Sequence, residues 1–149
     1  MKAIEIKEQT SISLLKNFTA PLLGVNIPAG FPSPADDYIE DRINLNDYIV
    51  THPSATFYYR AEGNSMIDAG IFDGDLLVVD NSLTPQNNDI VVAIIDGERT
   101  LKQIKIANGK ICLSPKNINY KPIEITDSMN ITVCGVLVCN IHFHKRQLK

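Results

Sequence analysis

The sequence contains no tryptophan and only three cysteines in 149 residues. Cys112, Cys134 and Cys139 are odd in number and form no CxxC pair, which argues against a disulfide framework and against a zinc knuckle. If residues 134–139 form one strand, the cysteines at its two ends point to opposite faces and cannot share a metal ion. We therefore predict no metal site and interpret all three thiols as small, buried hydrophobic groups.

The sequence also lacks an excess of positive charge. Its formal net charge is -3 and its pI is about 5.5, whereas non-specific binding to duplex DNA depends on phosphate contacts from lysine and arginine. The clustered basic residues are confined to the C-terminal end, at His144, Lys145, Arg146 and Lys149. We therefore expect no direct binding to duplex DNA.

Long hydrophobic runs are absent as well. No apolar segment approaches the roughly 18 residues that a membrane-spanning helix needs. The N-terminal segment MKAIEIKEQTSISLLKNF carries charges every few positions and lacks the apolar core of a secretory signal peptide. We therefore expect no membrane association and a cytoplasmic location.

The overall composition is that of a folded protein, with 44% hydrophobic and 21% charged residues. A chain of this length suits one domain with a single core. Residues 1–29 are weakly periodic and end in several prolines and glycines, so we interpret them as an arm. The Pro-rich stretch at residues 30–34 keeps the chain extended, because proline fixes its own φ and disfavours helix in the preceding residue.

Most of the remaining sequence is strand-like. Asp96-Gly97 and Asn108-Gly109 separate β-rich segments, and these dipeptides are the strongest short hairpin signals. The apolar spacing over residues 36–50 instead favours one or two helical turns. The predicted strands cover residues 56–61, 75–80, 90–95, 100–106, 110–113, 123–126 and 131–143. The predicted fold class is thus mainly β, a single β-rich domain with an extended N-terminal arm.

Lys102 is the most unusual residue of these strands. Side chains alternate along a strand, so Lys102 shares a face with Ile104 and Ile106. The ordinary explanation is a lysine that extends past the edge of an apolar face. The alternative is a desolvated lysine, because burial lowers the pKa of an ammonium group and makes the neutral amine available as a base. A lysine of the second kind needs a nucleophile beside it.

Ser65 is the candidate nucleophile. It lies in the segment Gly63-Asn64-Ser65-Met66, directly after a predicted strand. A bend at the glycine can present the hydroxyl together with nearby backbone N–H groups. A serine in such a turn is ordinarily a cap or loop residue, so the motif gains its meaning from Lys102.

A Ser-His-Asp triad is the rival arrangement, for which the sequence offers His52, His142 and His144. None of them is part of a supporting local motif. His52 precedes Pro53 in a predicted loop. His142 and His144 lie two apart at a strand end, where they could contact a metal ion, although solvent-facing histidines are commoner at such places.

Three segments carry a resemblance to a known family. GFPSPADDYIEDRINLNDYIVTHPSAT, GNSMIDAGIFDGDLLVVD and DIVVAIIDGERTLK closely resemble the UmuD branch of the LexA-like self-cleaving proteins. The similarity extends from about residue 30 to residue 138. The Ser-Met and Thr-x-Lys motifs occur in the family's order and at its spacing of just under 40 residues.

The resemblance implies a β-rich fold in which Ser65 is the nucleophile and Lys102 is the general base. It also implies that the substrate is a peptide bond of the protein's own N-terminal arm. The family cleaves between a small residue and a glycine, which places the bond between Ala29 and Gly30. By the same analogy, the backbone N–H groups of Asn64 and Ser65 are assigned to the oxyanion hole.

The resemblance further implies partners and a division of the chain. RecA bound to single-stranded DNA stimulates self-cleavage in this family. The shortened protein, as a homodimer, is an accessory subunit of an error-prone Y-family DNA polymerase in the SOS response. No cofactor is implied. The chain would consist of an arm, residues 1–29, and a protease and polymerase-interaction domain, residues 30–149.

Two other interpretations stay open. The chain could be a non-catalytic module that regulates the polymerase through a protein interface. It could also be a phage or plasmid regulator of the same family with another client. A LexA-type repressor is disfavoured, because 29 residues are too few for a helix-turn-helix domain ahead of the protease.

Overall fold

The computed structural model describes residues 18–32 and 38–145. The predictions for the arm before residue 18, for residues 33 and 34 of the Pro-rich stretch, and for Arg146 and Lys149 lie outside the described residues. The chain divides into two compact units, residues 1–51 and 52–149, whose strands form separate sheets. No helix within the described ranges is long and apolar enough to cross a membrane.

The first unit contains a two-stranded antiparallel sheet that was not predicted. Strand β1 (Ala20–Leu23) pairs with β2 (Ile39–Ile43), and the short helix α2 (Leu45–Ile49) follows. The one or two helical turns predicted within residues 36–50 are thus present as α2, while Ile39–Ile43 forms a strand instead. Pairing with β1 supplies the hydrogen-bond partners of this strand. Asn44 caps α2, its side chain accepting a hydrogen bond from a first-turn N–H at 3.1 Å.

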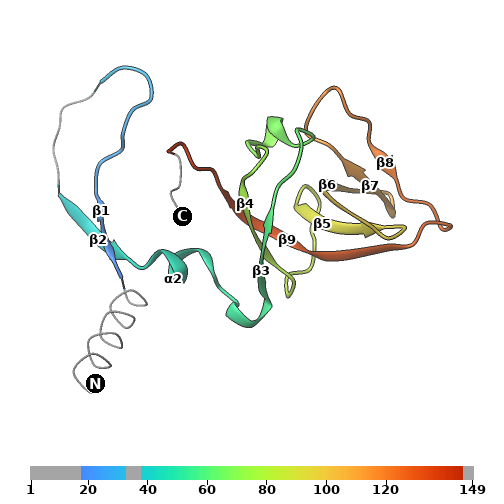
Figure 1. The fold of residues 1–149 in the computed structure, drawn as a ribbon, viewed down its shortest axis with the longest axis horizontal. Coiled ribbons are helices and arrows are strands. Elements are labelled where there is room, and N and C mark those ends of the chain that lie inside the picture. Colours follow the sequence, from blue (N-terminus) through green and yellow to red (C-terminus); the bar gives the residue numbers. More distant parts are fainter. Residues whose placement is uncertain (1–17, 33–37, 146–149) are drawn as a thin grey trace, which may run out of the picture. The chain divides into compact units, whose positions relative to one another are not determined.

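The second unit is built on a seven-stranded antiparallel sheet with the strand order β3-β4-β9-β5-β6-β7-β8 (Figure 1). The last strand, β9, is inserted between β4 and β5 and so connects the early and the middle strands. The strands are β3 (Thr56–Arg60), β4 (Leu76–Asp80), β5 (Ile90–Ile95), β6 (Glu98–Ala107), β7 (Lys110–Ser114), β8 (Ile123–Glu124) and β9 (Ile131–Ile141). Short 3-10 turns occupy Pro53–Ala55 and Ile67–Ala69. The mainly β prediction is confirmed.

The two predicted hairpins that join β5, β6 and β7 are present. Asp96 and Gly97 have φ angles of 48° and 87°, and Asn108 and Gly109 have φ angles of 52° and 73°. Two consecutive positive φ angles are typical of a type I′ turn, whose twist matches that of the flanking strands. Strand β6 is longer than predicted at both ends, while β8 and β9 end earlier than predicted.

The core consists of two apolar clusters on opposite faces of the sheet. Val91 and Val92 are neighbours on β5 but belong to different clusters, because successive side chains of a strand point to opposite faces. The first cluster contains Met66, Ile71, Leu77, Val79 and Val92, and the second contains Val91, Ala93, Ile104, Leu113 and Val136.

The three cysteines are free and half-buried, so the expectation of fully buried thiols is wrong. Cys112 shows the physical reason. Its neighbour Leu113 is fully buried in the second cluster, and adjacent side chains on a strand point to opposite faces. Cys112 therefore points away from that cluster.

Candidate active site

The chain leaves β3 at Arg60 and enters a turn that carries Ser65. Gly63 has a φ of 85°, a left-handed conformation that favours glycine. The Gly63 N–H donates a hydrogen bond to Asp73 Oδ1 at 2.7 Å. Met66, directly after the serine, is buried in the first core cluster. The turn is thus held on both sides of Ser65, by a hydrogen bond before it and a buried side chain after it.

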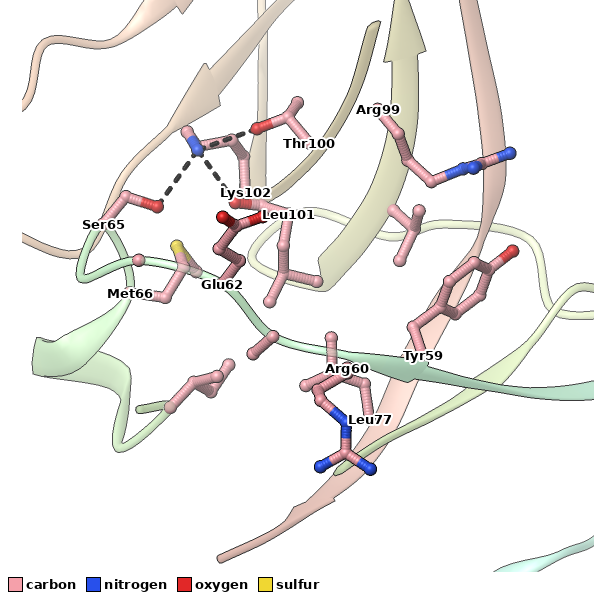
Figure 2. A pocket seen from close by; sticks show the side chains of 14 residues that line it. Tyr59, Arg60, Glu62, Ser65, Met66, Leu77, Arg99, Thr100, Leu101 and Lys102 are labelled. Carbon is pink, nitrogen blue, oxygen red and sulfur yellow. Dashed lines mark hydrogen bonds between the residues drawn. The ribbon is translucent and has the colours of Figure 1, made fainter. Parts of the chain in front are cut away.

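Lys102 on β6 lies buried beside this turn, with 9% of its surface exposed. Its Nζ lies 3.2 Å from Ser65 Oγ, 2.8 Å from Thr100 Oγ1 and 3.0 Å from the Leu101 carbonyl oxygen (Figure 2). Burial lowers the pKa of Lys102 below that of an exposed lysine. The structure therefore brings the two predicted side chains together, although their roles as nucleophile and base stay predictions.

The three acceptors around Lys102 Nζ match the three N–H donors of an ammonium group, and they also allow a neutral amine whose lone pair faces the serine. An ammonium group has three N–H donors, whereas a neutral amine has two donors and one lone pair. Thr100 Oγ1 and the Leu101 carbonyl oxygen are the two nearer acceptors. When they take the two hydrogens of the neutral amine, the lone pair is directed at the remaining neighbour, Ser65 Oγ. A general base needs this arrangement.

Thr100 was not singled out from the sequence as a site residue, although strand periodicity contains the signal. It lies two positions before Lys102 on β6, so the two side chains must share a face. Ile104, two positions later, is 3% exposed, as the pattern predicts. Ile106 is 39% exposed because it lies near the end of β6, so the buried face is shorter than expected.

A pocket of about 370 Å³ opens beside Ser65 and Lys102. Residues 59–63, from the end of β3 into the turn, and residues 99–102 of β6 both line it (Figure 2). Its apolar lining comes from Ala61, Met66, Ile71, Leu77, Val92 and Leu101, and its charged lining from Arg60, Glu62, Arg99 and Lys102. A pocket flanked in this way by strand segments suits a peptide in extended form.

The backbone N–H groups assigned to the oxyanion hole have no other use in the structure. The N–H groups of Asn64 and Ser65 donate no hydrogen bond to any residue that the structure describes. Ser65 lines the pocket, whereas Asn64 does not. The assignment of these two donors therefore stays a prediction.

The bond assigned to cleavage, between Ala29 and Gly30, lies in the first unit, in the segment that follows β1. Both residues are exposed and belong to no helix or strand. Their neighbours Ile27 and Phe31 are 87% and 93% exposed. A Cβ atom added to Gly30 would meet no atom within 4 Å. The segment is thus accessible, as a substrate segment must be.

His52 and His142 each pair with a buried aspartate. His52 Nδ1 lies 2.6 Å from Asp80 Oδ2, and His142 Nδ1 contacts Asp75 Oδ1. Among the described residues, no hydroxyl group forms a hydrogen bond with either ring, so neither pair has the serine that a triad requires. The His142 side chain is 38% exposed, as expected for a histidine at a strand end, and its ring also serves the buried Asp75 carboxylate, which requires a partner.

Asp75 directly precedes β4 and Asp80 is its last residue. Burial raises the pKa of Asp75, but hydrogen bonds from the Phe72 N–H and from His142 outweigh it and the net pKa shift is downward. The hydroxyl of Ser82 and then the paired histidine lower the pKa of Asp80 against the effect of burial. Both carboxylates are ionised at neutral pH and stabilise the ends of β4.

The remaining histidine stacks on its neighbour. The rings of His142 and His144 have centroids 4.8 Å apart in an edge-to-face arrangement. Within residues 18–32 and 38–145, no group of three or more metal-ligating side chains is close enough to hold an ion. The described residues thus give no support for a metal site at His142 and His144, which their spacing of two residues had suggested.

The sequence was also compared with known proteins. The peptidase S24-like family matches residues 21–138. The chain is 51% identical over 126 residues to protein ImpA of Escherichia coli, which covers 85% of this chain and 86% of that protein. It is 43% identical over 124 residues to protein SamA of Salmonella typhimurium, covering 83% and 86%. It is 39% identical over 142 residues to protein MucA of Escherichia coli, covering 95% of both chains.

These matches agree with the resemblance drawn from the motifs. They extend over nearly the same residues as the three segments quoted above, and they include the turn with Ser65 and the strand with Lys102. The resemblance to the UmuD branch of the LexA-like proteins is therefore confirmed. This chain belongs to the peptidase S24-like family.

Proposed function

We propose that this chain is a Ser/Lys self-cleaving endopeptidase that acts in SOS mutagenesis. The observation that carries the proposal is the 3.2 Å contact between Ser65 Oγ and the Nζ of the buried Lys102. The chain also belongs to a family of peptidases. A serine hydroxyl is too weakly acidic to attack a peptide carbonyl without a base, and a desolvated amine supplies that base.

In the first half of the reaction, Ser65 Oγ attacks the carbonyl carbon of Ala29 while its proton moves to the neutral amine of Lys102. The N–H groups of Asn64 and Ser65 stabilise the negative oxygen of the tetrahedral intermediate. The lysine then gives its proton to the nitrogen of Gly30 and the carbon–nitrogen bond breaks. An ester between Ala29 and Ser65 remains.

In the second half, water replaces the departed chain. Lys102 accepts a proton from a water molecule as the water oxygen attacks the ester carbon. The ester bond breaks, and the proton passes from the lysine to Ser65 Oγ. The products are an arm that ends at Ala29 and a protein of residues 30–149.

The choice of bond rests on local chemistry as well as on the resemblance. Ala29 and Gly30 are two small residues in succession, which lets the serine hydroxyl approach the carbonyl carbon. Their exposure leaves the bond accessible. A Gly30→Glu change should block cleavage, because it places a bulky charge next to the reacting carbonyl.

The proposal includes the partners that the family relationship suggests. RecA bound to single-stranded DNA would stimulate cleavage by favouring the conformation in which the arm occupies the pocket, without adding catalytic groups. The product, as a homodimer in the cytoplasm, would be an accessory subunit of an error-prone Y-family DNA polymerase. Similarity to ImpA, SamA and MucA over most of the chain supports this assignment.

The test is to incubate the purified protein with RecA, ATP and single-stranded DNA and to determine the products by mass spectrometry. We expect a stable product that begins at Gly30. A different new N-terminus would move the site, and no cleavage at all would favour the non-catalytic module. Ser65→Ala and Lys102→Ala should each abolish cleavage.

Matched controls separate chemistry from general damage. Lys105→Ala removes an exposed lysine of the same strand, and Ser128→Ala removes an exposed hydroxyl elsewhere. Both controls should cleave at the wild-type rate. Near wild-type cleavage by Ser65→Ala or Lys102→Ala would exclude the Ser/Lys mechanism.

The assembly and the lack of duplex binding have their own tests. Sedimentation equilibrium should give the mass of a homodimer, and a monomer at micromolar concentration would contradict this part of the proposal. A gel-shift assay with random duplex at physiological salt should show no complex, because the net charge of -3 favours few phosphate contacts.

A further inference from the structure

The segment after β7 forms hydrogen bonds with the turn that carries Ser65, although the two segments are far apart in the sequence. The Lys116 N–H donates to the Ser65 carbonyl oxygen at 2.8 Å, and the Asp68 N–H donates to the Lys116 carbonyl oxygen at 2.8 Å. The side-chain amide of Asn117 donates from Nδ2 to the Asn64 carbonyl oxygen at 2.8 Å. The nucleophile turn is therefore supported from outside by residues 116 and 117.

Asn117 has a buried side-chain amide whose nitrogen and oxygen both have hydrogen-bond partners. It is 8% exposed, and its Oδ1 accepts a hydrogen bond from the Asn119 N–H at 3.0 Å. Its carbonyl oxygen accepts from the Tyr120 N–H at 3.1 Å. A buried amide with these bonds holds one orientation, because turning it would leave a buried donor unsatisfied. It is not among the residues that line the pocket.

The bond from Asn117 holds a peptide group that matters for catalysis, and it is the shorter of two bonds to the Asn64 carbonyl, which also accepts from the Ile67 N–H at 3.4 Å. The peptide between Asn64 and Ser65 is planar and trans, so its carbonyl and its N–H point in opposite directions. When Asn117 holds the carbonyl on one side of the turn, the Ser65 N–H must face the other side. That N–H donates to no residue that the structure describes, which leaves it free for a ligand oxygen.

We propose that Asn117 is a positioning residue for the oxyanion hole. Its amide orients the Asn64–Ser65 peptide so that the Ser65 N–H faces the oxygen that becomes negative when Ser65 attacks. Asn117 acts through this peptide and touches neither substrate nor the reacting atoms. The inference rests on the proposed self-cleavage, and the test below separates the two.

The decisive variant is Asn117→Asp, studied in the full chain at alkaline pH. The carboxylate keeps the shape of the side chain and an acceptor for the Asn119 N–H, but it has no hydrogen to give to the Asn64 carbonyl. Asn119→Asp is the matched control, since it makes the same chemical change at an exposed side chain of the same loop. Asn117→Ser, which is too short to reach the carbonyl, is a second variant in case the aspartate variant does not fold.

Two rates are measured for each protein. The first is single-turnover self-cleavage as a function of pH. The second is phosphonylation by a fluorophosphonate probe, in which the Ser65 oxygen bonds to phosphorus, fluoride leaves, and Lys102 takes the hydroxyl proton. The phosphoryl oxygen of the probe occupies the oxyanion position, and this reaction does not need the arm.

We expect Asn117→Asp to lower both rates at least about tenfold, approaching the roughly 10²–10³-fold effect of losing one oxyanion donor. The pH at which the cleavage rate levels off should not change in the uncharged Asn117→Ser protein, because the contacts of Lys102 are untouched and no charge is added beside it. Asn119→Asp should keep both wild-type rates. A change that only loosened the fold would instead shift the levelling pH or lower the unfolding temperature in step with the rates.

Each result has one meaning. Wild-type rates in a folded Asn117→Asp or Asn117→Ser protein overturn the role of Asn117 and leave self-cleavage intact. If the wild type does not cleave but Ser65 is phosphonylated in an Asn117-dependent way, self-cleavage fails and the positioning role stands. If the wild type neither cleaves nor is phosphonylated at Ser65, both proposals are overturned.

Discussion

Thr100→Val tests whether the hydroxyl beside Lys102 orients the base. Valine has nearly the size of threonine but accepts no hydrogen bond, so the change removes the 2.8 Å contact from Lys102 Nζ to Thr100 Oγ1. The neutral amine then loses one of the two acceptors that direct its lone pair at Ser65. One such hydrogen bond contributes about 1 kcal/mol, which corresponds to about a fivefold lower rate of cleavage.

The pH dependence gives this prediction a second, independent signature. Only the neutral amine of Lys102 accepts a proton, so the wild-type rate should rise up to about tenfold per pH unit while the ammonium form predominates. Burial lowers the pKa of Lys102, so the rate should level off at a lower pH than an exposed lysine would require. Thr100→Val removes an acceptor that favours the ammonium form, so the pKa of Lys102 should be lower still in this variant. The loss of cleavage rate in Thr100→Val should therefore be largest on the alkaline plateau of the rate and smaller at neutral pH.

The assay is single-turnover cleavage of purified protein between pH 7 and pH 10 without RecA, with Ser65→Ala as the blank for contaminating proteases. Thr100→Ser, which keeps the hydroxyl, should resemble the wild type. Thr132→Val, an exposed exchange on β9, controls for the gain of a methyl group. A Thr100→Val protein with the wild-type rate at every pH, or with the same deficit at every pH, would refute the reasoning.

Three further predictions concern stability. Gly135→Ala should lower the free energy of unfolding in urea by about 1–3 kcal/mol, because its Cβ would lie 2.6 Å from Val79 Cγ1; an unchanged midpoint would contradict the contact. Asp75→Asn should lower the unfolding temperature at pH 7. In acid, the unfolding temperature of this variant should fall less steeply with decreasing pH than that of the wild type. The pKa of this carboxyl is lowered in the folded state, so its stabilisation is complete above about pH 4 and is lost as the pH falls through the lowered pKa. Lys102→Met should abolish cleavage yet raise the unfolding temperature at pH 7, because burial lowers the pKa of Lys102 and makes its charged form costly in the folded state. This gain in unfolding temperature should vanish above about pH 10.4, where the lysine of the unfolded chain is also neutral.

The sequence alone determined the features that depend on neighbouring residues. Asp96-Gly97 and Asn108-Gly109 predicted two hairpins because few residues adopt two consecutive positive φ angles without strain, and both turns are present. The alternation along β6 predicted that Lys102 shares a face with Ile104, and both are buried. The motifs around Ser65 and Lys102 identified the family over most of the chain.

Only the tertiary structure decided the contacts between segments that are distant in the sequence. The pairing of β1 with β2 limits the helical turns predicted within residues 36–50 to Leu45–Ile49, because hydrogen bonds to another strand outweigh weak local spacing. The partnership of His142 with Asp75 and the support of the Asn64 carbonyl by Asn117 join residues 67 and 53 positions apart. A local sequence pattern does not predict which buried polar groups form hydrogen bonds with each other. Buried polar groups such as these find their partners only in the assembled sheet, in which β9 lies between β4 and β5.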